Sequence, residues 1–292
     1  MENVELVITP KVSDLGGNFQ VRRSLPFRKK RMVGPFIFWD HMGPVELLGD
    51  KSMEVRSHPH IGLATLTWLF SGEILHRDSL GNEQTILPGQ VNWMTAGKGI
   101  SHSERAYEKG DAPLSLEGIQ LWIALPKESE KVDPSFFHCK ENEIPVKEDK
   151  GASIRLIAGE AFDMKSPVPV YSQLFYLNIE ANAGYEFNFD LDQKSEGAVY
   201  VAGGIVKVGD QEYDKYNLII FKQGTSINFT ASEDAKIMVF GGEVFPEKRF
   251  IWWNFVATSE ELIEDAKTRW NSREFGEVIN EDADNFIPLP AD

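Results

Sequence analysis

The sequence predicts an all-β protein with two β-barrels or sandwiches in tandem and one short helix near the C-terminus. Short runs of β-branched and aromatic residues recur at close spacing between turn signals in both halves. The halves differ in charge: residues 1–140 carry 16 basic and 17 acidic side chains, whereas residues 141–292 carry 14 and 28. A chain of 292 residues is also long enough for two cores of ordinary size.

Strand signals in the first half begin with Ile61–Phe70, which is rich in Thr, Leu and aromatic residues and ends at the turn signal Ser71-Gly72. Two runs flanking residues 79–82 then indicate a hairpin. The further strands expected here span residues 73–78, 83–87, 90–95 and 119–125.

The second half repeats this rhythm without a residue-level repeat. Its expected strands span residues 171–179, 197–208, 211–213, 216–221, 226–230 and 236–240. The helix is indicated by the capping box Thr258-Ser259-Glu260-Glu261 and by an apolar face that includes Ile263 and Trp270. We therefore expect a first barrel over residues 1–130, a linker over 131–150, and a second barrel with the helix over 151–292.

Composition narrows the class of protein. The lone cysteine, Cys139, excludes an internal disulfide and a Cys-based structural zinc site. The acidic start lacks the layout of a signal peptide, and no apolar run approaches the ~20 residues that span a bilayer. We expect a cytoplasmic protein without membrane contact. Direct nucleic-acid binding is not expected from so acidic a chain, and the basic run Arg28–Arg31 is interpreted as a solvated loop.

The histidines carry the chemical signal. All six lie between His41 and His138, and His58-Pro59-His60 places two imidazoles on one face of an expected strand. His102-Ser103-Glu104 repeats this spacing with an imidazole and a carboxylate. Convergence of the two strands would gather three nitrogens and one oxygen, a donor set that suits Fe, Mn, Co, Ni, Cu or Zn. One such pair is more often two structural histidines; two pairs in an all-β chain favour a metal site.

At these residues the chain resembles the pirin family, whose members are bicupins with two jelly-roll barrels. The resemblance covers nearly the whole chain and is densest over residues 20–125. It is carried by Val21-Arg22-Arg23-Ser24-Leu25-Pro26, Val33-Gly34-Pro35-Phe36-Ile37-Phe38, Asp40-His41-Met42-Gly43-Pro44, His58-Pro59-His60-Ile61-Gly62, residues 93–104 (WMTAGKGISHSE), Leu121-Trp122 and Asn254-Phe255-Val256.

The resemblance implies one metal in the first barrel, most often iron, bound by His58, His60, His102 and Glu104. A typical cupin supplies a Glu soon after its paired histidines, but residues 62–65 (GLAT) contain none, so Glu104 is the one carboxylate expected. The second barrel of pirins lacks a metal, which agrees with the absence of histidine after His138.

Two classes of function follow from the resemblance. Some bacterial pirins are similar to quercetinases, dioxygenases that open the central ring of a flavonol with dioxygen and release carbon monoxide; Glu104 would then be a candidate general base. Other pirins resemble redox-responsive regulators, in which the oxidation state of iron changes the affinity for a protein partner without catalysis. We expect the dioxygenase, with a flavonol-like aromatic substrate, and keep the regulator as the alternative.

Other residues near the motifs have weaker signals. Six apolar side chains could line a flat pocket, although ordinary core is the favoured interpretation of each: Phe36, Phe38, Trp39, Met42, Trp93 and Met94. His41 could orient a ligand or be structural. His76 lies on an expected hairpin strand, where a pocket role is possible but nothing in the sequence supports one. His138 and Cys139 are expected to be inert, and Arg22 and Arg23 to form structural ion pairs.

Overall fold

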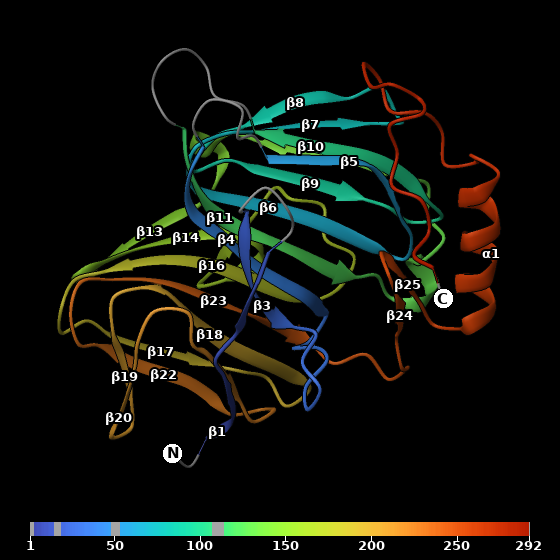
Figure 1. Ribbon diagram of the computed structural model, residues 1–292. Coiled ribbons are helices and arrows are strands. Elements are labelled where there is room, and N and C mark those ends of the chain that lie inside the picture. Colours follow the sequence, from blue (N-terminus) through green and yellow to red (C-terminus); the bar gives the residue numbers. More distant parts are fainter. Residues whose placement is uncertain (1–2, 15–18, 48–52, 107–113, 292) are drawn as a thin grey trace. The chain divides into compact units, whose positions relative to one another are not determined.

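The computed structural model describes residues 3–14, 19–47, 53–106 and 114–291 (Figure 1). Strands dominate this part of the chain, and its single α-helix, α1 (Glu260–Asn271), lies near the C-terminus. Within the described residues no helix has the length and apolar character needed to cross a membrane. The predicted class, two cupin-type barrels with a short C-terminal helix, is confirmed.

The two compact units are assembled from interleaved segments. The first barrel contains residues 13–21, 41–141 and 246–292, and the second barrel contains residues 1–12, 22–40 and 142–245. The expected division at 1–130 and 151–292 therefore has to be corrected at both ends of the chain. The first strand, β1 (Val4–Ile8), joins the second barrel, and the C-terminal segment with α1 joins the first, because their apolar side chains pack there.

The expected linker, residues 131–150, contains one of the crossings between units, at 141/142. It is otherwise structured, since it includes the strands β12 (Ser135–Cys139) and β13 (Val146–Asp149). The charge and proline content of this stretch suggested a linker, but both strands pair along sheet edges, where charged residues remain solvated.

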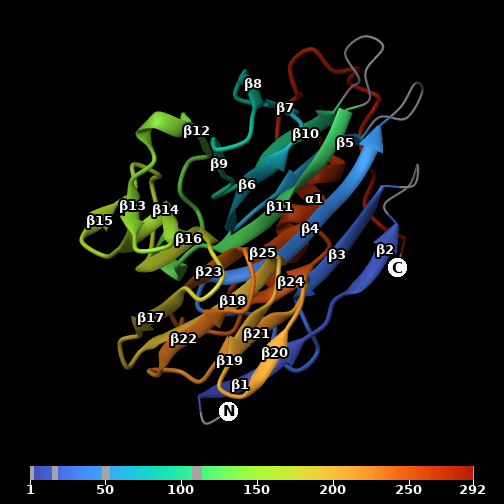
Figure 2. The same cartoon turned by 90° about the vertical axis from the view of Figure 1, so that its left-hand side faces the viewer.

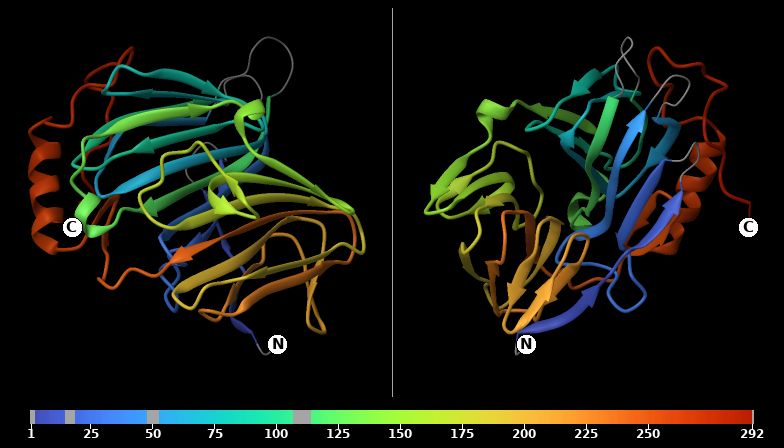
Figure 3. Two further views of the ribbon diagram at one scale, coloured as in Figure 1. Left: turned by 180° about the vertical axis from the view of Figure 1, so that it is seen from behind. Right: turned by 60° about the vertical axis from the view of Figure 1, so that its left-hand side comes forward.

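Two sheets form the first barrel (Figure 3). One has the order β5-β10-β7-β8, and the other includes β12-β9-β6-β11 and continues through β4, β3 and β2, in which the chain passes between units. The bounds are β2 (Lys11–Asp14), β3 (Gln20–Leu25), β4 (Phe36–Leu47), β5 (Met53–His60), β6 (Leu63–Ser71), β7 (Ile74–Asp78), β8 (Glu83–Ile86), β9 (Val91–Thr95), β10 (Ile100–Ala106) and β11 (Leu114–Ala124).

The second barrel also has two sheets, ordered β1-β21-β18-β23-β16-β14-β13 and β17-β22-β19-β20, with β15 paired to β14 (Figure 2). The bounds are β1 (Val4–Ile8), β14 (Ala152–Ala161), β15 (Met164–Lys165), β16 (Leu174–Ala181), β17 (Glu186–Asp190), β18 (Ser195–Gly203), β19 (Val206–Val208), β20 (Gln211–Tyr213), β21 (Leu218–Phe221), β22 (Ser226–Ala231) and β23 (Ala235–Glu243). The described residues also include two short 3₁₀ turns, at Lys127–Ser129 and Glu141–Glu143.

The C-terminal segment of the first barrel begins with a hairpin, β24 (Phe250–Trp252) and β25 (Phe255–Ala257). The α1 helix packs on this hairpin through Ile263, Ala266 and Trp270 (Figure 1). Its N-cap is Ser259, whose hydroxyl accepts the Leu262 backbone N–H, one residue later than the capping box Thr258–Glu261 predicts. The hairpin thereby lies along the end of β5, where Ile61 and Phe255 form an isolated bridge.

Candidate metal centre

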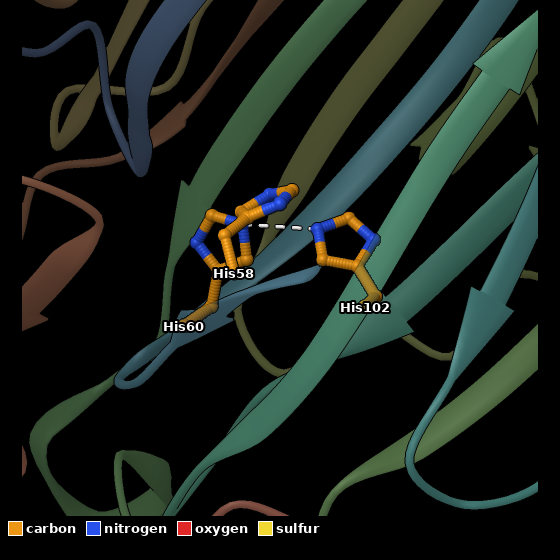
Figure 4. A group of neighbouring side chains, drawn as sticks. All are labelled: His58, His60 and His102. Atoms are coloured by element: carbon orange, nitrogen blue, oxygen red, sulfur yellow. Dashed lines mark hydrogen bonds between the residues drawn. The ribbon is translucent and has the colours of Figure 1, made fainter. Parts of the chain in front are cut away.

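Three histidines meet inside the first barrel. His58 and His60 project from β5, and His102 projects from β10, where it pairs with His58 across the antiparallel ladder (Figure 4). One ring nitrogen from each lies within 4.8 Å of the others, and all three side chains are buried. The spacing of two residues puts both β5 imidazoles on the same face, as the sequence predicted.

The hydrogen bonds of these rings determine where their protons lie. His58 Nδ1 is 2.8 Å from the Arg56 carbonyl oxygen, and His60 Nδ1 is 3.2 Å from the Asn254 carbonyl oxygen. A carbonyl can only accept, so both Nδ1 atoms carry the proton and donate it. The Nε2 atoms of both rings are therefore left with free lone pairs.

His102 has a side chain, not a backbone carbonyl, as the hydrogen-bond partner of its Nδ1. Its Nδ1 lies 3.4 Å from His76 Nδ1, and His76 Nε2 lies 3.0 Å from Asp78 Oδ2. Residues 76 and 78 lie on β7 opposite Glu104 and His102 of β10, with all four side chains on one face. No role was predicted for His76, although His76-Arg77-Asp78 repeats the spacing of the other two pairs and could have indicated it.

Burial keeps the three imidazoles neutral. It lowers the pKa of His58 to about 4 and holds the pKa values of His60 and His102 well below the ordinary 6.5, and the neighbouring histidines add to the effect. A neutral imidazole offers a lone pair without first losing a proton, which is the form that binds a metal.

The spacing of the donor atoms fits a cation. His60 Nε2 and His102 Nε2 lie 3.1 Å apart, shown by the dashed line in Figure 4. Because His60 carries its proton on Nδ1, the lone pair on its Nε2 faces a ring nitrogen of His102. Two nitrogens each about 2.1 Å from one ion would be about 3 Å apart at a right angle. The residues present therefore fit a first-row divalent metal.

Glu104 is the fourth predicted ligand, and it is not part of this group of three donors. It lies on β10 two residues beyond His102, beside a register shift between these two residues and β5. Burial raises the pKa of its carboxyl to about 7. The structure thus brings together three of the four predicted ligands, and coordination by Glu104 stays a prediction.

Most of the apolar side chains considered as pocket candidates pack against other side chains. Phe36 and Trp39 are fully buried and pack against Phe240 of the same unit, with ring centroids 4.9 and 4.3 Å apart. Phe38 lies under the Arg23 guanidinium in the same unit. In the first barrel Trp93 and Met94 are buried on β9, and Met42 belongs to a hydrophobic cluster. The interpretation of Phe36 and Trp39 as core is supported by these contacts.

The polar candidates are also accounted for. Arg23 forms the predicted ion pair, with Asp40, at 2.7 Å, whereas Arg22 lies over the Tyr216 ring. His41 Nε2 is 3.1 Å from a Glu117 carboxylate oxygen, which favours the structural alternative. His138 Nδ1 contacts Asn92 Oδ1 at 2.8 Å. In the predicted solvated loop, Lys30 is bound by Glu196 and Glu5.

A two-barrel β protein with a three-histidine cluster in one barrel is a bicupin with a candidate metal centre. Two family models match the chain: Pirin over residues 18–123 and the Pirin C-terminal cupin domain over residues 176–276. A pirin-like protein of Caulobacter vibrioides is 47% identical, with the match covering 98% of this chain and 99% of that protein. The chain belongs to the pirin family.

Two further relatives bear on function. A Pseudomonas aeruginosa protein named "Putative quercetin 2,3-dioxygenase PA1205" is 35% identical over 90% of this chain and 82% of its own. The crystal structure of quercetin 2,3-dioxygenase from Acinetobacter baumannii superposes with a TM-score of 0.90 at 33% identity, covering 98% of this chain and 95% of that one.

Proposed function

We propose that this protein is a metal-dependent dioxygenase of the quercetinase type. His58, His60, His102 and Glu104 bind one divalent metal, and the substrate is a flavonol-like aromatic compound that reacts with dioxygen. The observation that carries the proposal is the convergence of three buried imidazoles, with one ring nitrogen of each within 4.8 Å of the others. The quercetin 2,3-dioxygenase names of the two relatives supply the reaction class.

The site chemistry suits such a substrate. A bound divalent metal would act as a Lewis acid that favours the anionic form of the flavonol hydroxyl. In this proposal the Glu104 carboxylate, two residues from His102 on the same face of β10, accepts the hydroxyl proton. The Trp122 ring lies 5.1 Å from the His60 ring in an edge-to-face contact and is an apolar neighbour of this ligand. Glu104 is thus both the fourth ligand and the general base.

Imidazole and carboxylate donors do not select one metal among the first-row ions. Iron is our first choice because of the family, and Mn, Co, Ni, Cu and Zn remain to be compared directly. The protein should be stripped of metal, loaded with each ion separately, and its metal content measured before assay.

The test is dioxygen consumption together with carbon monoxide release when each loaded form is mixed with quercetin. We expect turnover with at least one metal and none in a His58→Ala variant, which lacks a ligand. The matched control is His138→Ala, because His138 contacts Asn92 and not the metal position. No turnover with any metal at confirmed occupancy would overturn the enzyme proposal and favour an iron-dependent regulator that binds a protein partner.

Glu104→Gln separates binding from base catalysis. The amide keeps the shape of the side chain but cannot accept the substrate proton in the same way. We expect the variant to retain metal and to lose at least 100-fold in turnover, the usual range for a general base. Unchanged turnover would show that Glu104 is not the base.

A further inference from the structure

Three pairs of chemically active side chains line one face of the sheet β5-β10-β7, each pair separated by two positions. The proposed metal site uses two of these pairs, His58 with His60 and His102 with Glu104. The third, His76 with Asp78, is buried beside them and has no part in the ligand set. Two ionisable groups are rarely buried without a purpose in folding or in a site.

The Asp78 carboxylate accepts several hydrogen bonds. One carboxylate oxygen accepts the backbone N–H groups of Leu80 and Asn82 at 2.9 and 3.1 Å, and the Asn82 side-chain amide donates to both oxygens. A carboxylate that receives so many donors is ionised and has no proton to give. The proton in the 3.0 Å contact with His76 Nε2 therefore belongs to the histidine.

The position of the His76 proton determines the tautomer of the ligand His102. With its proton on Nε2, His76 has a lone pair at Nδ1, the atom that faces His102 Nδ1 at 3.4 Å. His102 must then carry its own proton on Nδ1, which leaves its Nε2 free. We propose that His76, held by Asp78, is a positioning residue that fixes His102 in its metal-binding tautomer. The inference rests on the metal site of the proposed function.

The His76 ring is held on three sides. Phe136 of β12 stacks on it with ring centroids 4.5 Å apart and an interplanar angle of 16°. Asp78 and His102 hold its two nitrogens, so the ring cannot turn without losing all three contacts.

His102 differs in this respect from the two β5 ligands. Backbone carbonyls orient His58 and His60, and a carbonyl accepts whatever side chain surrounds it. The partner of His102 is an imidazole, which can present either a donor or an acceptor. The Asp78 carboxylate is what makes His76 an acceptor toward His102. A carboxylate two hydrogen bonds away from His102 therefore sets the tautomer of this ligand. Such outer partners also make the ligand nitrogen more basic.

Substitutions at His76 test the inference. His76→Phe keeps the aromatic stacking on Phe136 but removes the acceptor, whereas His76→Asn replaces Nδ1 by an amide oxygen at nearly the same place. We expect His76→Phe to weaken metal binding about 10- to 100-fold, the usual effect of losing an outer partner, and His76→Asn to restore most of the loss. His138→Phe, a matched change at a histidine outside the site, should bind metal like the parent.

Three readouts distinguish positioning from a merely structural role. The thermal midpoint of metal-free His76→Phe should stay close to that of metal-free His76→Asn. The visible absorption of the cobalt-loaded protein should change in His76→Phe and revert in His76→Asn. In the zinc-loaded parent, nitrogen–proton NMR correlations should find the His76 proton on Nε2. A His76 proton on Nδ1 would overturn the inference, as would parent-like affinity and cobalt absorption in His76→Phe.

Failure of this inference can be told apart from failure of the site itself. If the parent binds no metal, or if His102→Ala retains full occupancy, the proposed site is wrong, and so is the positioning role of His76. If metal binding depends on His102 but has the same affinity in the parent and in His76→Phe, the proposed site is retained and only the positioning role of His76 is wrong.

Discussion

The two barrels are similar in fold but differ in what fills them. The second barrel encloses one large cluster of aliphatic and aromatic side chains that includes Leu177, Phe229 and Val239. The described interior of the first barrel buries histidines, Asp78, Asn92 and several threonines beside a smaller apolar cluster. Burying polar groups is unfavourable unless each finds a partner. The interior of the first barrel therefore holds a polar site at a cost in core stability, whereas the second barrel has an ordinary apolar core.

The C-terminal segment contributes to the polar site of the first barrel. The β24–β25 hairpin supplies the Asn254 carbonyl that orients His60. It can do so because Gly62 lets β25 approach closely: a Cβ there would lie 2.0 Å from the Val256 carbonyl oxygen, and φ is +67°. The site is thus completed by residues almost 200 positions beyond its first ligands.

The largest expected effect tests the histidines directly. His60→Ala should reduce bound metal from one per chain to nearly none and weaken affinity more than 100-fold, because a ligand is lost together with its lone pair. Metal analysis after dialysis measures this, with His138→Ala as the control. A second metal per parent chain, or full occupancy in His60→Ala, would contradict the assignment of metal binding to the first barrel alone.

A core truncation in the second barrel should show the opposite behaviour. Leu177 is fully buried, and Leu177→Ala should lower the free energy of unfolding by about 2–5 kcal/mol through lost burial and a cavity. Urea titration of the metal-free protein measures this, and Leu87→Ala, at a residue 43% exposed, is the control. Metal affinity should be unchanged at temperatures where the variant is folded; a tenfold loss would show that the site depends on the second core.

An ion pair attaches the C-terminal tail to the first barrel. The Glu281 side chain, 4% exposed, accepts hydrogen bonds from Arg105 Nε at 2.7 Å and from Ser103 Oγ at 2.9 Å. Burial works to raise the pKa of Glu281, but these donors and the positive charges outweigh it, so the pKa lies below its ordinary 4.5. The carboxylate therefore stabilises the fold above about pH 4.5, and this contribution is lost as the pH falls through the folded pKa.

Glu281→Gln should accordingly cost about 2 kcal/mol of unfolding free energy at pH 7, the usual value for hydrogen bonds to a charged group. The difference from the parent should shrink as the pH falls below 4.5 and through the lower folded pKa, where the parent carboxyl becomes protonated. Urea titrations at several pH values measure this. Glu277→Gln, an exposed position in the same segment, should have no effect at either pH. A difference that does not change with pH would show that the charge of Glu281 is not what stabilises the tail.

Much of this architecture could be predicted from local patterns. The run over residues 61–70 became β6, the hairpin around residues 79–82 became β7 and β8, and the capping box became the start of α1. These features depend on residues close in sequence. The exchange of terminal segments between barrels could not be predicted, because it depends on contacts between residues such as Ile61 and Phe255, far apart in the chain.

The site divides in the same way. The i, i+2 spacing singled out His58 with His60 and His102 with Glu104, and the resemblance to pirins implied that these residues are metal ligands. The Asn254 carbonyl could not have been found, since a backbone oxygen has no sequence signal. His76 could have been, because its spacing from Asp78 matches that of the other two pairs.

The smallest expected effect concerns the helix that backs the hairpin. Ser259→Ala removes the hydroxyl that caps α1 and should lower the free energy of unfolding by about 1 kcal/mol, whereas Ser259→Asp should retain the cap. The buried face of α1, through Ile263 and Trp270, should hold the hairpin in place even when the first turn frays. Metal affinity should then stay within twofold of the parent. A tenfold loss in Ser259→Ala, rescued in Ser259→Asp, would mean that the first turn of α1 helps to fix the Asn254 carbonyl, and with it the orientation of His60.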